Sequence, residues 1–440
     1  MPRIAFHTLG CKVNQYDTQA MRELFLAAGY EEVPFSAEAE VYLINTCTVT
    51  GTGDRKSLQL ARRVRREHPS ARLILCGCMA QKQGQALLEE TGADLVLGTR
   101  FRGEVVSLLR QAEQENRPVC AVAPLPEGLP FEALNITQVS EHTRATVKIQ
   151  EGCNNRCTYC IIPSVRGPIR SRRPADLREE ILRLRDAGFV EIVLTGIHLA
   201  SWGLDWPGSG LTLLDAIRVV HDVEGIERIR LGSLEPVIAT EAFAAALRDL
   251  PKVCPQFHLA LQSGSDTVLA RMRRRYNTSQ YLRAADHLRN AFPHAAFTTD
   301  ILTGFPGETE QEYQETRAFI EKMGYARIHV FPYSPREDTP AAAMPGQLSP
   351  ALKEQRAREL IALGEQVAGR YLESWLNQET VLLPEEKLHG CWEGYTPEYI
   401  RVTLPPDVEC VSGSLLPVRL TALSPKGMLA VPLSPAGQAS

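Results

Sequence analysis

The chain has 440 residues, of which 44% are hydrophobic and 23% are charged, which is typical of a globular protein with two to four domains. Its net charge of −4 gives no overall sign of a nucleic-acid binder, and its apolar runs are too short to span a bilayer. The start, "MPRIAFHTLG", lacks the pattern of a signal peptide, so we expect a cytoplasmic protein without a membrane partner. Eleven cysteines in reducing surroundings exclude a disulfide framework, and their clustering points to metal.

The first hundred residues alternate apolar strand segments with helical segments. This βα alternation predicts an open parallel sheet covered by helices, which we assign to an α/β domain at residues 1–110. Cys11, Cys47 and Cys78 each lie just past the carboxyl end of a predicted strand. Because these ends share one edge of a parallel sheet, we expect the three cysteines to converge. The predicted strands are 3–9, 41–46, 71–77 and 93–98.

A proline-containing stretch without clear periodicity, residues 111–142, is predicted to be a linker. Strand and helix segments then alternate again over residues 143–369, which predicts six βα units in a partial (β/α)6 barrel. From residue 370 to 434 the chain consists of short β-rich segments joined by Gly and Pro turns. We expect a small all-β barrel there.

The stretch "EGCNNRCTYCIIPSVRG" follows the first strand of the second series and contains Cys153, Cys157 and Cys160. Structural zinc prefers four protein ligands, and catalytic zinc usually includes His, Asp or Glu. Three cysteines within eight residues, without such a partner nearby, suit a four-iron cluster whose fourth iron stays open for chemistry. A Cys-x-x-Cys pair alone is a zinc knuckle or a redox pair as often as it is part of an iron–sulfur site. The three-cysteine spacing, with Tyr159 before the last cysteine, is more specific for an iron–sulfur cluster.

This three-cysteine motif resembles the signature of the radical S-adenosylmethionine enzymes. With "HTLGCKVNQYDT", "INTCTVTGTGDRKS", "LCGCMAQ" and "LTGIHLASWG", the chain resembles the methylthiotransferases of that group, within the branch that modifies tRNA bearing N6-threonylcarbamoyladenosine. The resemblance runs through nearly the whole chain. It implies a radical S-adenosylmethionine barrel in the centre and a TRAM-like RNA-binding barrel at the end.

The resemblance also implies roles for the cysteines and for the strand ends. Cys11, Cys47 and Cys78 would hold an auxiliary [4Fe-4S] cluster, and the later triad would hold the cluster that cleaves S-adenosylmethionine. Glu235 and Asp300 belong to the S-adenosylmethionine site that the resemblance implies; the alternative is that they cap a helix or satisfy buried backbone. For His198 the motif is equally compatible with a structural role and with contact with the substrate. The implied S-adenosylmethionine site comprises Tyr159, Thr195, Gly196, Ser233, Glu235, Gln262 and Asp300.

Two features depart from a simple match. Cys76 stands two residues before Cys78, so spacing permits either as the ligand, although "GCMAQ" favours Cys78. The tail from residue 371 to 440 contains four Lys or Arg and eight Asp or Glu, so the expected RNA-binding barrel is acidic. We therefore expect arginines of the central domain to bind RNA, and expect two of them, Arg166 and Arg170, to contact the threonylcarbamoyl carboxylate. The predicted RNA-binding set is Arg166, Arg170, Arg172 and Arg173.

The expected function is the conversion of N6-threonylcarbamoyladenosine at position 37 of tRNA to its 2-methylthio derivative. The expected cofactors are two [4Fe-4S] clusters and S-adenosylmethionine. The expected partners are the tRNA anticodon loop and an external flavodoxin- or ferredoxin-like electron donor, with the enzyme a monomer. Sibling activities on isopentenyladenosine tRNA or on a ribosomal-protein aspartate share both triads, and a different class of function is an iron–sulfur electron carrier.

Overall fold

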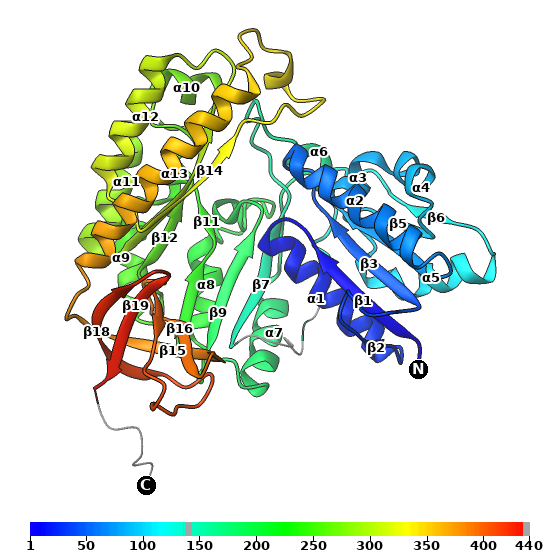
Figure 1. The fold of residues 1–440 in the computed structure, drawn as a ribbon, viewed down its shortest axis with the longest axis horizontal. Helices are drawn as coiled ribbons and strands as arrows, with labels where there is room; N and C mark the ends of the chain where they lie inside the picture. Colours follow the sequence, from blue (N-terminus) through cyan, green and yellow to red (C-terminus); the bar gives the residue numbers. More distant parts are fainter. Residues whose placement is uncertain (135, 137–142, 434–440) are drawn as a thin grey trace.

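The computed structural model describes residues 1–134, 136 and 143–433 (Figure 1). The last part of the predicted linker and residue 434 of the predicted barrel therefore lie outside the described residues. An N-terminal α/β domain lies beside a central domain, and a small β-barrel formed by the C-terminal part of the chain lies against the central domain (Figure 1). Among the described residues, no helix combines the length and the apolar character that crossing a membrane requires.

The N-terminal domain contains a six-stranded parallel sheet in the order β2-β1-β3-β4-β5-β6. The central strand, "VYLINT", is buried at all six positions because helices cover both faces of the sheet. The open parallel sheet is confirmed, but β6 and the end of α5 fall inside the predicted linker, because a three-residue edge strand has too few residues to show a periodic pattern. The strands are β1 (Arg3–Thr8), β2 (Glu31–Glu32), β3 (Val41–Thr46), β4 (Arg72–Gly77), β5 (Leu95–Leu97) and β6 (Val119–Ala121). The helices are α1 (Lys12–Ala27), α2 (Gly51–Glu67), α3 (Cys78–Gln83), α4 (Gln85–Thr91), η1 (Arg102–Glu104) and α5 (Val105–Gln114).

The central domain has the six parallel strands that the sequence predicts, divided between two four-stranded sheets. The sheets are joined by a bridge between Ile229 and Val253, which makes a partial barrel and confirms the expected architecture. Two further short strands, β8 and β11, lie at strand carboxyl ends. The strands are β7 (Arg144–Glu151), β8 (Arg170–Ser171), β9 (Glu191–Gly196), β10 (Arg228–Leu231), β11 (Ser233–Leu234), β12 (Gln256–Leu259), β13 (Ala296–Thr303) and β14 (Arg327–Pro332).

Helices on the outside of the partial barrel begin at polar caps. Asn277 and Gln280 form a reciprocal capping box at the start of α11, and Thr309 and Glu312 form another at the start of α12. The α-helices are α6 (Ile162–Arg166), α7 (Pro174–Asp186), α8 (Leu213–His221), α9 (Glu241–Arg248), α10 (Asp266–Arg271), α11 (Thr278–Ala291), α12 (Glu310–Met323) and α13 (Pro350–Glu373). Short 3₁₀ turns are η2 (Leu199–Ser201), η3 (Pro236–Ile238) and η4 (Pro340–Ala343).

The C-terminal barrel is closed by five strands in the order β15-β16-β17-β19-β18. The domain boundary predicted at residue 370 lies inside the last turn of α13, since the first barrel strand begins at Glu379. Arg228 and Arg230 of β10 donate hydrogen bonds to barrel carbonyl groups, at 3.1 Å to Tyr395 and 2.9 Å to Pro397. The barrel strands are β15 (Glu379–Leu388), β16 (Cys391–Tyr395), β17 (Arg401–Thr403), β18 (Leu416–Ser424) and β19 (Gly427–Pro432).

Candidate functional site

The three N-terminal cysteines converge at one edge of the six-stranded sheet. Cys11 precedes α1, Cys47 follows β3, and Cys78 is the first residue of α3. A Cβ atom on Gly10 would lie 3.1 Å from the Cys47 Sγ, so the backbone beside Cys11 packs directly on Cys47. Burial raises the pKa of the Cys78 thiol to about 11, and the charges of Cys11 and Cys47 raise it as well, which places all three sulfurs in one electrostatic neighbourhood.

Cys76 lies inside β4 rather than at its end. Its side chain is 1% exposed, and its Sγ lies 3.7 Å from the carbonyl oxygen of Ile44 within the apolar core. Burial raises the pKa of this thiol further above its ordinary value than that of Cys78. This placement favours Cys78 as the ligand and leaves Cys76 as a core residue.

The second triad lies in the loop between β7 and α6. This loop is fixed by Thr158, whose backbone N–H and hydroxyl donate to the carbonyls of Met272 and Arg271 at 3.1 and 2.9 Å. Gly152 opens the loop with a φ of +74°, and a Cβ there would lie 1.9 Å from a neighbouring carbonyl oxygen, so only glycine fits. Burial raises the pKa of the Cys160 thiol to about 12, with further contributions from the charges of the two other cysteines.

Several polar side chains surround the buried Glu235 next to the second triad. Its carboxylate accepts from Arg274 at 2.9 Å and lies 2.9 Å from the Nε2 of His198, while Asn155 donates to it at 3.2 Å. Burial opposes the ionisation of Glu235, but the hydrogen bond from His198 and the charge of Arg274 outweigh it, so its pKa lies below the usual range. Arg274 also donates to the Cys157 Sγ at 3.2 Å, which connects this carboxylate to the triad.

The contacts of Glu235 test one of the alternatives predicted for it, that it caps a helix. It precedes η3, but its side chain makes no capping hydrogen bond, so the helix-cap alternative is wrong. Asn155 and Arg274, which belong to this group, were not assigned to a site from the sequence. The sequence signals for them are the "CNNRC" spacing and a run of arginines at residues 271–275.

The remaining predicted S-adenosylmethionine residues lie at strand ends around the barrel. Thr195 and Gly196 end β9, and Ser233 is exposed at the start of β11. Gln262, with a φ of +72°, donates through its backbone N–H to the carbonyl of Asp300 at 2.9 Å. The Asp300 side chain lies 3.3 Å from the Nε2 of His258. Tyr159 packs edge-on against the ring of Phe305, at a centroid distance of 6.5 Å.

The predicted RNA-binding arginines require a correction. Arg166, Arg170 and Arg172 are 0%, 5% and 0% exposed, so they do not form a surface for phosphates or for a threonylcarbamoyl carboxylate. Arg172 pairs with the buried Glu180, and Arg166 pairs with Asp17 and Glu151. Of the four, only Arg173 is exposed.

Other arginines are exposed beside the second triad. Thr158 of the triad loop donates hydrogen bonds to backbone carbonyls at the end of α10 and in the turn that follows it. The exposed side chains of that turn therefore lie near Arg156, the exposed arginine of the triad loop. One member, Arg273, has a φ of +56°, a conformation that costs free energy in a residue other than glycine. We call this set the triad-rim arginines: Arg156, Arg273 and Arg275.

Both triads provide thiols and a compensating cation. Burial raises the pKa of the Cys78 and Cys160 thiols, and a bound metal would ionise them. A buried guanidinium lies 3.2 Å from one sulfur at each place, Arg166 at Cys78 and Arg274 at Cys157. Within the described ranges, no three His, Cys, Asp or Glu side chains converge on the position of a single ion. A cluster needs less convergence, because each thiolate binds a separate iron.

Comparison with known proteins identifies relatives along the whole chain. A family model described as "Uncharacterized protein family UPF0004" matches residues 3–98, and one described as "Radical SAM superfamily" matches residues 147–320. The threonylcarbamoyladenosine tRNA methylthiotransferase MtaB of Bacillus subtilis is 40% identical over 96% of this chain and 94% of its own length. The protein of the same name from Thermotoga maritima is 33% identical over 98% of this chain and 96% of its own length.

Two further matches cover less of this chain. The tRNA-2-methylthio-N(6)-dimethylallyladenosine synthase of Mycobacteroides abscessus is 37% identical over 82% of this chain and 72% of its own length. Among solved structures, the radical S-adenosylmethionine methyltransferase TsrM from Kitasatospora setae matches with a TM-score of 0.56 and 14% identity, covering 78% of this chain and 74% of that chain. At this identity the match supports the fold alone.

Proposed function

Because the chain belongs to the family of the threonylcarbamoyladenosine tRNA methylthiotransferases, we propose that it attaches a methylthio group to carbon 2 of N6-threonylcarbamoyladenosine in tRNA, at position 37. The feature that supports this function most directly is the pair of cysteine triads, each at strand carboxyl ends of its own domain. One [4Fe-4S] cluster at each triad, together with S-adenosylmethionine, completes the proposed cofactor set.

Cys153, Cys157 and Cys160 would hold the radical cluster, and Cys11, Cys47 and Cys78 the auxiliary cluster. When bound, the first cluster and S-adenosylmethionine supply a carbon radical that can remove hydrogen from the unactivated carbon 2, and the second supplies the sulfur that is methylated. The chain's own contribution is visible around Glu235. This ionised carboxylate provides a hydrogen-bond acceptor for ribose hydroxyl groups, and it holds Arg274 against Cys157.

Selection of the threonylcarbamoyl group needs a cation that is free to meet its carboxylate. Arg166 and Arg170 are buried, so we propose Lys12 instead. Lys12 follows Cys11 directly, is exposed, and makes no ion pair with any described carboxylate. Burial lowers the pKa of Lys12, and the Tyr399 hydroxyl of the C-terminal barrel acts in the opposite direction, so this cation lies within electrostatic reach of the barrel.

The test is a reaction with purified, anaerobically reconstituted and reduced protein, S-adenosylmethionine and a sulfur source. We expect mass spectrometry of the digested tRNA to detect 2-methylthio-N6-threonylcarbamoyladenosine, with little product on unmodified or isopentenylated tRNA. Equal turnover of isopentenylated tRNA would favour the sibling activity, to which the 37% identical relative points. Product only on a ribosomal protein, or no S-adenosylmethionine cleavage at all, would refute the proposal. The electron donor, the monomeric state and the cytoplasmic location stay predictions.

A further inference from the structure

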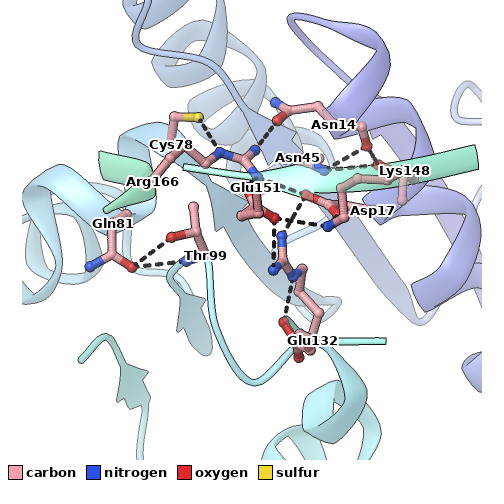
Figure 2. A network of polar contacts seen from close by, with 12 residues as sticks. Asn14, Asp17, Asn45, Cys78, Gln81, Thr99, Glu132, Lys148, Glu151 and Arg166 are labelled. Carbon is pink, nitrogen blue, oxygen red and sulfur yellow. Dashed lines mark hydrogen bonds and ion pairs between the residues drawn. The ribbon is translucent and has the colours of Figure 1, made fainter. Parts of the chain in front are cut away.

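A buried network of charges joins the N-terminal domain to the central domain (Figure 2). Lys148 of β7 pairs with Asp17 of α1 and with Glu151 of its own strand, at 2.9 Å between the Lys148 Nζ and the Glu151 Oε2. Arg102 pairs with Asp17 at 2.6 Å and with Glu132 at 2.8 Å. Most of these side chains are less than 5% exposed, so each charge must be balanced by a near neighbour rather than by water.

Arg166 connects this network to the auxiliary cysteines. Its Nε donates to the Cys78 Sγ at 3.2 Å, its Nη1 donates to Asp17 at 3.0 Å and Glu151 at 2.7 Å, and its Nη2 donates to Asn14. Figure 2 shows Arg166 between Cys78 on one side and Asn14 and Glu151 on the other. With all three nitrogens engaged, the guanidinium is held in one orientation.

The network contains more positively charged side chains than negatively charged ones. Arg170 is also buried, and its side chain forms no ion pair within 4.0 Å among the described residues. Four cations therefore face three carboxylates, which leaves one excess positive charge in the network that contacts Cys78 through Arg166. The four cations are Arg102, Lys148, Arg166 and Arg170, and the carboxylates are Asp17, Glu132 and Glu151. A four-iron cluster bound by three thiolates has a net negative charge, which this excess would balance.

Arg166 also belongs to the segment that carries the other triad. α6 begins at Ile162, two residues after Cys160, and ends at Arg166. A side chain from the helix that follows the radical triad therefore contacts Cys78, a proposed ligand of the auxiliary site in another domain.

We propose that Arg166 is a positioning residue of the auxiliary centre, whose fixed positive charge raises the reduction potential of a cluster held by Cys11, Cys47 and Cys78 and helps to retain it. This inference rests on the proposed function. A cation next to a cluster sulfur favours the reduced, more negative state, and removing the cation lowers the potential. The same charge would balance the net negative charge of a thiolate-bound cluster, which helps to retain it.

The experiment uses the full chain with Cys153, Cys157 and Cys160 replaced by alanine, so that only the auxiliary cluster forms. Arg166→Gln and Arg166→Lys are made on this background. Arg356→Gln is the matched control, because Arg356 is a buried arginine paired with Glu308 at 2.6 Å that contacts no cysteine. Iron content and the midpoint potential are measured after anaerobic reconstitution, the potential by redox titration followed by electron paramagnetic resonance.

We expect Arg166→Gln to shift the midpoint to a more negative potential or to lose the cluster. Arg166→Lys should stay nearer the reference, and Arg356→Gln should match it. An unchanged potential with full iron in Arg166→Gln would overturn the inference, as would an equal shift or loss in Arg356→Gln. If the reference protein itself holds no iron, the cluster assignment of the proposed function fails, which is distinguishable from a cluster that forms but does not respond to Arg166.

Discussion

Replacement of Arg172 should affect stability rather than RNA binding. Arg172 and Glu180 are both 0% exposed, and Glu180 is otherwise contacted by the Tyr16 hydroxyl and the backbone N–H of Ile136. In Arg172→Met the Glu180 carboxylate would stay buried without its cation, which costs about 3–5 kcal/mol of unfolding free energy. Replacing both partners with apolar residues, Arg172→Met with Glu180→Leu, should recover most of that loss, because no buried charge is left.

This prediction includes a pH dependence. Burial raises the pKa of Glu180 even with Arg172 present, and removing Arg172 would raise it further. An acid whose pKa is higher in the folded state binds its proton more tightly when folded, so its stabilising contribution is present at low pH and is lost as pH rises through the folded-state pKa. The stability deficit of Arg172→Met should therefore be largest at neutral and alkaline pH and shrink toward pH 5.

Urea unfolding followed by tryptophan fluorescence measures both effects. Trp202 is a local reporter, since its indole N–H donates to the Arg172 carbonyl at 3.1 Å and its ring is fully buried. The control is Arg173→Met at the adjacent exposed position, which should change stability by no more than about 0.5 kcal/mol. Unchanged stability of Arg172→Met, combined with weaker tRNA binding and a flatter salt dependence, would refute the assignment of Arg172 to the core.

Three further predictions concern the cluster sites and the substrate. Cys76→Ala should keep about eight irons per reconstituted chain, whereas Cys78→Ala should keep about half; the opposite result in an iron assay would reverse the choice of ligand. Replacing the triad-rim arginines together with glutamine should weaken tRNA binding and reduce its salt slope by up to about 0.9 unit for each phosphate that the protein no longer neutralises, and a filter-binding titration with an unchanged slope would exclude them. Lys12→Met should lower kcat/KM for threonylcarbamoylated tRNA by about tenfold or more, the effect of one charged hydrogen bond, while leaving iron content intact; an equal decrease on unmodified tRNA would show that Lys12 does not read the carboxylate.

The arrangement of the two triads follows from sequence pattern. Strand segments that alternate with helices specify a parallel sheet, and a parallel sheet brings its carboxyl ends to one edge. Cys11, Cys47 and Cys78 are placed together by that rule alone, although 30 or more residues separate them in the chain. Local sequence also determines the second triad, since Cys153 and Cys160 lie within one loop.

The burial of the arginines does not follow from such local patterns. Arg166 and Arg172 lie in a polar segment with four arginines, which in isolation indicates a solvated surface. The carboxylate of Asp17 that pairs with Arg166 is 149 residues away in another domain, and Glu180 is reached only after the next helix begins. A charge is buried when tertiary structure supplies its counter-charge, and neither hydropathy nor spacing carries that information.

The composition of the C-terminal barrel has a related explanation. Three of its four cations, Lys387, Arg401 and Arg419, are paired with the barrel's own glutamates. Glu385 forms an ion pair with Arg144 of β7, so part of the barrel's acidic charge faces arginines of the central domain instead of solvent. The acidic barrel is thus held by the central domain and offers little free positive charge to phosphates. Electrostatic binding of tRNA therefore needs cations outside the barrel, and the exposed triad-rim arginines lie in and beside the loop of the proposed radical chemistry.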